Sequence, residues 1–114
     1  MKYLSTMMRL KRFDSVKRGL QRIEVNRLTV SSVFGYDVQR GYLETKAMNY
    51  EAKLPQKIRL EVTANDDFLQ PTIEEINRGS ISKNQGNVGN GKIFMLPLED
   101  ITRICTNENG PHTI

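Results

Sequence analysis

The sequence predicts a single α+β domain of the ferredoxin-like type, in which two helices cover one face of a four-stranded antiparallel sheet. Two observations predict this class. Four short stretches are rich in alternating or β-branched apolar residues, and two longer stretches between them repeat apolar residues at helical spacing. Their order is strand, helix, strand, long loop, strand, helix, strand. The length of 114 residues suits one compact core and is too short for two comfortable domains.

The first half of the chain supplies two strands and one helix. Residues 2–9 are short, rich in apolar side chains and partly alternating, which is typical of a strand. Residues 13–23 repeat large apolar side chains at helical spacing and leave basic side chains for water, so they predict an amphipathic helix. Residues 27–35 are rich in β-branched side chains and end at Gly35, which predicts the second strand.

The second half repeats this pattern. Residues 57–64 alternate apolar and polar side chains, as a half-buried strand does. Residues 65–79 begin with acidic side chains and predict a helix that ends before Gly79, with Pro71 in its first turns, where a missing N–H costs least. The apolar run at 92–98, closed by a proline, predicts a buried last strand.

The net charge of +4 is uneven along the chain. Residues 1–27 carry eight Lys or Arg against two acidic residues, a charge of +6, while the remainder carries nine against eleven, a charge of −2. One alternative is therefore a basic nucleic-acid-binding module, which would bind in a salt-dependent way. Trp is absent, aromatic residues are few and no base-stacking motif occurs, so we favour a solvated helix face and expect no nucleic-acid partner.

Composition also bears on catalysis and location. There is one His and one Cys, with no nucleophile or metal-ligand cluster at useful spacing, so a small enzyme lacks support. No stretch approaches the roughly 18 apolar residues that span a bilayer, and the N-terminus lacks the apolar region of a signal peptide. We therefore expect a cytoplasmic protein without membrane insertion. The single Cys105 cannot form an internal disulfide, which fits a reducing compartment.

Two features are not required by this fold. The loop between about Gly35 and Lys57 spans some twenty residues, and loops of that length in a compact domain are usually functional or disordered. The stretch NVGNGKIFML, residues 87–96, places two glycines around an asparagine and then a lysine directly before an apolar strand. Such a turn can simply reverse the chain, or it can present backbone N–H groups and one ammonium to an anion.

Three stretches carry a family resemblance: LTVSSVFGYDVQRGY before the long loop, LP followed by KIRLEVTANDD, and GNVGNGKIFMLPLEDITRICTNE. With the order of elements, they resemble the PII signal-transduction proteins of nitrogen metabolism over essentially the whole chain. The resemblance implies one domain, residues 1–114, with a T-loop at about 37–56, a B-loop at about 84–92 and a C-terminal segment at about 103–114. It also implies a regulator, not an enzyme. The resemblance further implies a homotrimer, which binds ATP or ADP between its subunits and contacts a transporter or metabolic enzyme through the T-loop.

The resemblance assigns phosphate contacts to residues around the last strand. Gly89 and Gly91 let the backbone approach phosphate closely, and Lys92 supplies a compact positive charge. Asn90 stands where the family has an aspartate, so a negative charge is absent there. Arg103 would reach the same phosphates, because a guanidinium suits pairs of oxygens.

The resemblance places the adenosine pocket at a second group of positions. Met7 would pack against the base, and Gly35 lies at the end of the second strand. Polar contacts would come from Thr29, Glu61 and Thr63. In a fold of this kind, Met7 and Gly35 also have ordinary structural uses, as sheet core and strand end.

The T-loop departs from the family pattern. Asp37 and Val38 occupy nucleotide-cleft positions where the family has glycine and arginine, which removes a phosphate contact and adds negative charge. Gln39 and Lys57 remain, and in the family they help to hold Mg²⁺, ATP and 2-oxoglutarate, Gln39 as an oxygen ligand and Lys57 as the counter-charge to a carboxylate. We expect Mg²⁺ only with ATP, no metal site from the protein alone, and weak or absent 2-oxoglutarate binding.

The remaining departures concern partner contact and one thiol. Tyr50 is the nearest match to the tyrosine that the family uridylylates, but the sequence around it differs, so a contact role is favoured. The expected partner contacts in the T-loop are Tyr42, Lys46, Met48 and Tyr50. Cys105 replaces a second family arginine, and we favour a small buried filler over a redox-responsive thiol.

Overall fold

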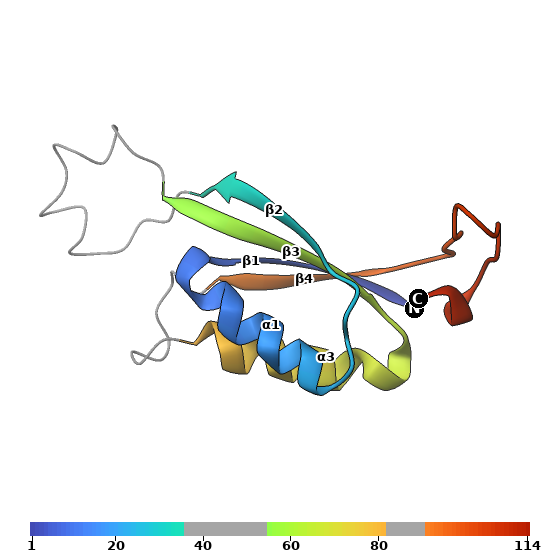
Figure 1. Ribbon diagram of the computed structural model, residues 1–114, viewed down its shortest axis with the longest axis horizontal. Helices are drawn as coiled ribbons and strands as arrows, with labels where there is room; N and C mark the ends of the chain where they lie inside the picture. The colour runs from blue at the N-terminus through green and yellow to red at the C-terminus, as the bar shows by residue number, and fades with distance from the viewer. Residues whose placement is uncertain (36–54, 82–90) are drawn as a thin grey trace, which may run out of the picture.

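The computed structural model describes residues 1–35, 55–81 and 91–114, and these show the predicted order of elements (Figure 1). The elements are β1 (Lys2–Arg9), the 3₁₀ turn η1 (Leu10–Arg12), α1 (Phe13–Arg22), β2 (Thr29–Phe34), β3 (Gln56–Ala64), α3 (Asp66–Ser80), β4 (Lys92–Pro97) and the 3₁₀ turn η4 (Pro111–Thr113). None of these described helices is long and apolar enough to cross a membrane.

The four strands form one antiparallel sheet in the order β2-β3-β1-β4, and both helices lie on the same face of it (Figure 1). β1 pairs with β3 along its whole length, from Lys2 opposite Ala64 to Arg9 opposite Lys57. The other edge of β1 pairs with β4. This arrangement confirms the predicted ferredoxin-like α+β class.

Alternation along β1 and β3 decides which side chains enter the core. Successive residues of a strand point to opposite faces of the sheet, so every second residue meets the helices. The core cluster consists of Leu4, Met8, Ile58, Leu60 and Val62 from the strands and Val16, Leu20 and Ile76 from the helices. The intervening residues of both strands therefore face the open side of the sheet, where the candidate site is built.

The two helices approach each other at glycines. A Cβ atom at Gly79 would lie 2.7 Å from the Cα atom of Val16, and one at Gly19 would lie 2.6 Å from a carboxylate oxygen of Glu75. Glu75 is buried and pairs with one arginine from each helix, at 3.6 and 2.6 Å. Gly79 lies inside α3, so the prediction that it follows the helix end was wrong. Close packing against α1, not termination of the helix, requires a glycine there.

Arg12 connects η1 to the end of α3. Its Nε atom donates to the carbonyl oxygen of Gly79 at 3.1 Å, and its Nη2 atom donates to that of Ile81 at 2.6 Å. The last carbonyls of a helix lack partners within the helix, so this guanidinium satisfies two of them. Arg12 thereby fixes the direction in which the chain leaves α3. At the other end of this helix, Pro71 lies in the second turn.

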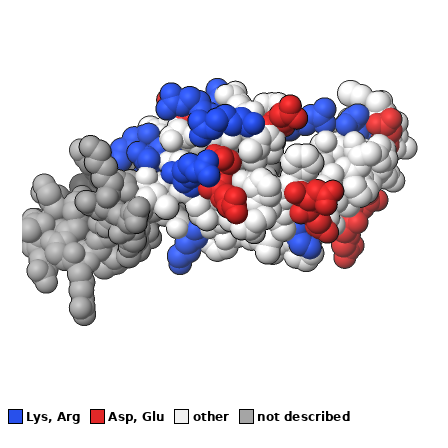
Figure 2. Space-filling view, turned by 90° about the horizontal axis from the view of Figure 1, so that it is seen from below, with Lys and Arg blue, Asp and Glu red and all other residues white. Residues whose placement is uncertain are grey.

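The outer surface of the helix layer carries charges of both signs (Figure 2). Lys17 and Arg18 of α1 are exposed, and acidic side chains lie among the basic ones in this view. A mixed surface of this kind is what a solvated helix face shows.

Candidate functional site

The open face of the sheet brings several predicted site residues together. Met7 of β1 lies opposite Arg59 of β3 on one side and opposite Lys92 of β4 on the other. Thr29 of β2 lies opposite Glu61 of β3. One surface thus holds a thioether between two cationic positions, followed along the sheet by polar groups.

The structure shows why position 91 requires a glycine, which the sequence did not reveal. Its φ angle is +104°, and a Cβ atom there would lie 1.9 Å from the carbonyl oxygen of Met7. The glycine therefore lets the chain enter β4 directly against β1. Because Lys92 follows as the first residue of β4 and is exposed, this entry also sets where its ammonium stands.

Tyr3 and Arg59 hold the carboxylate of Glu61 from two sides. The Tyr3 hydroxyl donates to Glu61 Oε2 at 2.7 Å, and Arg59 Nε lies 3.2 Å from Glu61 Oε1. The hydrogen bond to this carboxylate raises the pKa of the Tyr3 phenol above its ordinary value, with burial as a further cause. Neither Tyr3 nor Arg59 was predicted. Both could have been found, because strand alternation places Tyr3 on the face of Met7 and Arg59 on the face of Glu61.

A cavity of about 430 Å³ adjoins this network. It lies where the connection into β2 passes over the end of β3, so predicted and unpredicted residues meet there. Its lining consists of Tyr3, Asn26, Arg27, Leu28, Thr29, Glu61, Val62 and Thr63. Three of the predicted polar contacts, Thr29, Glu61 and Thr63, therefore share one hollow.

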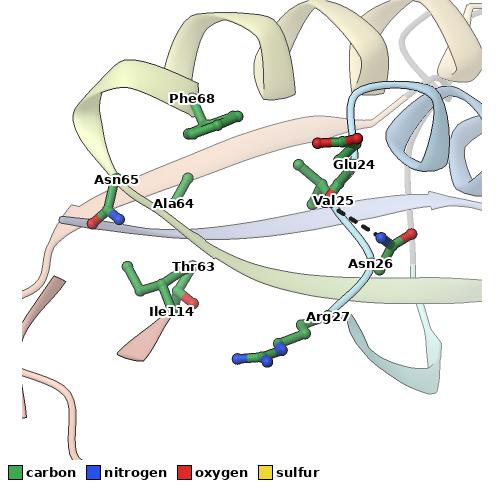
Figure 3. A pocket seen from close by; sticks show the side chains of 9 residues that line it. All are labelled: Glu24, Val25, Asn26, Arg27, Thr63, Ala64, Asn65, Phe68 and Ile114. Atoms are coloured by element: carbon green, nitrogen blue, oxygen red, sulfur yellow. Dashed lines mark hydrogen bonds between the residues drawn. The ribbon is translucent and has the colours of Figure 1, made fainter. Parts of the chain in front are cut away.

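A second cavity of about 380 Å³ lies beside the first and shares three lining residues with it, Asn26, Arg27 and Thr63 (Figure 3). Phe68 of α3 closes one side and the C-terminal Ile114 another. Asn26 donates to the backbone carbonyl of Glu24 at 3.4 Å. The connection between α1 and β2 therefore forms one wall of both hollows.

Gly35 and Lys57 pack against each other at the far end of β2. The Gly35 N–H donates to the carbonyl of Pro55 at 3.0 Å. A Cβ atom at Gly35 would lie 3.0 Å from Cγ of Lys57, whose residue is only 8% exposed. The glycine therefore makes room for the aliphatic stem of the lysine. In the single chain Lys57 is covered, so its ammonium has limited access to a ligand.

Arg103 lies away from Lys92. Its guanidinium donates to Glu108 Oε2 at 3.2 Å and to the carbonyl of Thr113 at 3.1 Å, within the C-terminal segment. That segment follows the last residue of β4, whereas Lys92 is the first (Figure 1). A strand of six residues is about 17 Å long. One chain therefore does not bring these two predicted phosphate contacts together.

Cys105 is exposed in the chain, so the favoured prediction of a buried filler was wrong. Its neighbour Ile104 is 96% exposed. Both belong to the segment that projects beyond the sheet, after β4 has ended (Figure 1). Side chains in such a segment meet few neighbours, and local sequence gives no sign of that.

Several predicted residues lie outside the described part of the chain. For the T-loop these are Asp37, Val38, Gln39, Tyr42, Lys46, Met48 and Tyr50, and for the B-loop they are Gly89 and Asn90. Their assignments stay predictions. Within residues 1–35, 55–81 and 91–114, no group of three or more His, Cys, Asp or Glu is arranged to hold a metal ion.

Comparison with known proteins gives the class. The family model described as "Nitrogen regulatory protein P-II" matches residues 1–108. The chain therefore belongs to the PII family of nitrogen regulatory proteins, whose members are signal-transduction regulators. This confirms the resemblance that the sequence motifs carried.

Individual relatives match over nearly their full length. Nitrogen regulatory protein GlnK1 of Methanosarcina mazei is 56% identical over 115 aligned positions, which cover 100% of this chain and 97% of the relative. Nitrogen regulatory protein P-II 1 of Methanothermobacter thermautotrophicus is 32% identical, with coverage of 100% and 97%. Nitrogen regulatory protein P-II of Azospirillum brasilense is 30% identical, with 100% of both chains covered.

Proposed function

We propose that this protein is a homotrimeric regulator that binds ATP or ADP between neighbouring subunits. It reports the cellular energy state, and with it nitrogen status, to a protein target through residues 37–56. It acts by binding and is not a catalyst. Family membership supports the regulatory class, and the arrangement of the described residues supports a ligand site shared between copies.

The separation of Lys92 from Arg103 carries the proposal. Both side chains suit phosphate oxygens, Lys92 as a compact charge and Arg103 as a fork of donors. Lys92 is the first residue of β4 and Arg103 lies in the segment that follows its last, so one polyphosphate cannot contact both within one chain. A second copy that presents its C-terminal segment to the start of β4 would complete the site. The site is therefore proposed to require the oligomer.

The adenosine moiety is assigned to the open face of the sheet. Met7 offers an apolar, polarisable surface for the base, and Thr29, Glu61 and Thr63 offer polar groups at the cavity of about 430 Å³. That volume lies within the range of small-molecule sites, about 300–1,000 Å³. Mg²⁺ would bind only together with ATP, and the side-chain oxygen of Gln39 would be its ligand from the protein.

Binding of 2-oxoglutarate is proposed to be weak or absent. Lys57, the residue that would neutralise a carboxylate, is only 8% exposed and lies against Gly35. Asp37, two positions after Gly35 in the sequence, adds a negative charge. Both features oppose capture of a dicarboxylate. Tight, ATP-dependent uptake of 2-oxoglutarate in a calorimetric titration would contradict this part of the proposal.

Calorimetry with ADP and with Mg²⁺·ATP tests the nucleotide site. Lys92→Ala removes one charge–phosphate contact and should weaken binding by about tenfold or more. Lys11→Ala is the matched control, because Lys11 is an exposed lysine on η1 and outside the site. Sedimentation analysis should show three copies. A monomer that ignores millimolar adenylates would refute the proposal.

The target is proposed to be a transporter component or a metabolic enzyme. Affinity capture with wild type, compared with a deletion of residues 42–52, tests whether this segment makes the contact. The deletion should lose the captured protein while it keeps nucleotide binding, because the proposed adenosine contacts lie in the sheet. Retention of the same partner by the deletion would place the contact elsewhere.

A further inference from the structure

The carboxylate of Glu61 is held in place before any ligand arrives. The Tyr3 hydroxyl, 2.7 Å from Oε2, and Arg59 Nε, 3.2 Å from Oε1, each engage one of its oxygens. Arg59 Nε is itself within 3.2 Å of the Ser31 hydroxyl. The result is a chain of contacts that crosses β2, β3 and β1 on the open face of the sheet.

Tyr3 is at the same time part of the wall of the cavity of about 430 Å³. Its ring reaches Glu61 from the neighbouring strand, because Tyr3 lies opposite Thr63 and Glu61 is the next residue of β3 on that face. The phenol keeps its proton, since the hydrogen bond to Glu61 raises its pKa. It is therefore a donor to this carboxylate across the physiological pH range.

We infer that Tyr3 is a positioning residue for the proposed nucleotide site, acting through Glu61. A carboxylate has about four lone-pair positions, so the hydrogen bond from Tyr3 to one oxygen and the ion pair of Arg59 with the other leave capacity for a further donor. Tyr3 and Arg59 fix the rotation of the carboxylate, and the free positions then accept an N–H or O–H of the adenosine moiety. This inference rests on the proposed function, because it assigns a role within that same site.

The expected effect follows from conformational freedom. A glutamate side chain loses rotamer freedom when a ligand orders it, and a side chain that is already ordered loses less. Tyr3→Phe keeps the ring and removes only the hydroxyl. We expect it to weaken binding of ADP by about fivefold, the cost of ordering about one side chain.

A double-mutant cycle separates positioning from general structural damage. ADP affinity is measured by calorimetry for wild type, Tyr3→Phe, Glu61→Ala and the double variant. If Tyr3 acts through the Glu61 carboxylate, the change from Tyr3 to Phe should have less than about a twofold effect once Glu61 is alanine. A purely structural role would give the same loss in both backgrounds.

The matched control is Ser32→Ala. Ser32 lies opposite the core residue Ile58, contacts Gln56 rather than Arg59 or Glu61, and is not among the residues that line the cavity, so its removal should change ADP affinity less than about twofold. Melting temperature without nucleotide reports folding for every variant. If wild type binds ADP, the inference alone is overturned when Tyr3→Phe has no effect, or when its effect is equally large in the Glu61→Ala background. Absence of ADP binding by wild type overturns both the inference and the proposed function.

Discussion

Gly91→Ala should be one of the most damaging single-methyl changes in the chain. The new Cβ atom would lie 1.9 Å from the carbonyl oxygen of Met7, and backbone cannot rotate away as a side chain can. The φ angle of +104° adds strain of about 1–2 kcal/mol for an L-residue. Relief of the clash requires the start of β4 to leave β1, which breaks about two hydrogen bonds at about 1 kcal/mol each. The expected loss of stability is therefore about 3–4 kcal/mol.

Gly110→Ala provides the control for this prediction. Gly110 also has a positive φ angle, +95°, but its nearest neighbour would be a histidine nitrogen 3.7 Å away. It should cost only the backbone strain, about 1–2 kcal/mol. Equilibrium unfolding in urea, with all variants at one protein concentration because oligomers unfold by mass action, measures both values. If Gly91→Ala costs no more than Gly110→Ala, the argument from close approach is refuted.

Three further predictions concern the helix layer and the open face. Gly79→Ala should destabilise by about 2–4 kcal/mol, and by more than Gly19→Ala, because the first methyl meets backbone of α1 at 2.7 Å and the second meets a flexible side-chain end at 2.6 Å. Arg12→Gln should cost about 1–3 kcal/mol, since the carbonyls of Gly79 and of Ile81, the residue that caps α3, lose a charged donor. The stability advantage of wild type over Tyr3→Phe should be complete below pH 10.0, the ordinary pKa of tyrosine. It should shrink as the pH rises above that value towards the raised pKa of the folded state.

Urea unfolding of each variant checks the first two predictions. Equal losses for the two glycine variants would show that the helices separate easily. An Arg12→Gln variant as stable as wild type would mean that water replaces the guanidinium without penalty. For the third, unfolding between pH 8 and pH 11 is followed for wild type and the phenylalanine variant, and a difference that grows with pH would contradict the proposed direction of the pKa shift.

Most of the fold could be predicted from local patterns of apolar and polar residues. Leu4 and Met8 on β1 and Leu60 and Val62 on β3 are set by alternation, which the sequence shows directly. Gly79 shows where such reading fails. A glycine near the end of a helical pattern is usually a stop signal, but here it lies inside α3 because another helix passes over it.

The candidate site divides in a similar way. The glycine before the last strand was singled out for a possible approach to phosphate, which stays a prediction, whereas the structure shows its approach to Met7. Tyr3 was passed over because an isolated tyrosine near a chain end carries no local motif. Its relation to Glu61 exists only across two paired strands, 58 positions apart in sequence.

By itself, the sequence of this protein determined the order of strands and helices, the core faces and the family. Each of these depends on periodicity or on contiguous motifs, which neighbouring residues encode. Only the tertiary structure decided that Lys92 and Arg103 lie towards opposite ends of β4, that Lys57 is covered, and that Tyr3 holds Glu61. Those facts depend on strand register and on packing between distant segments, and no local pattern of residues specifies them.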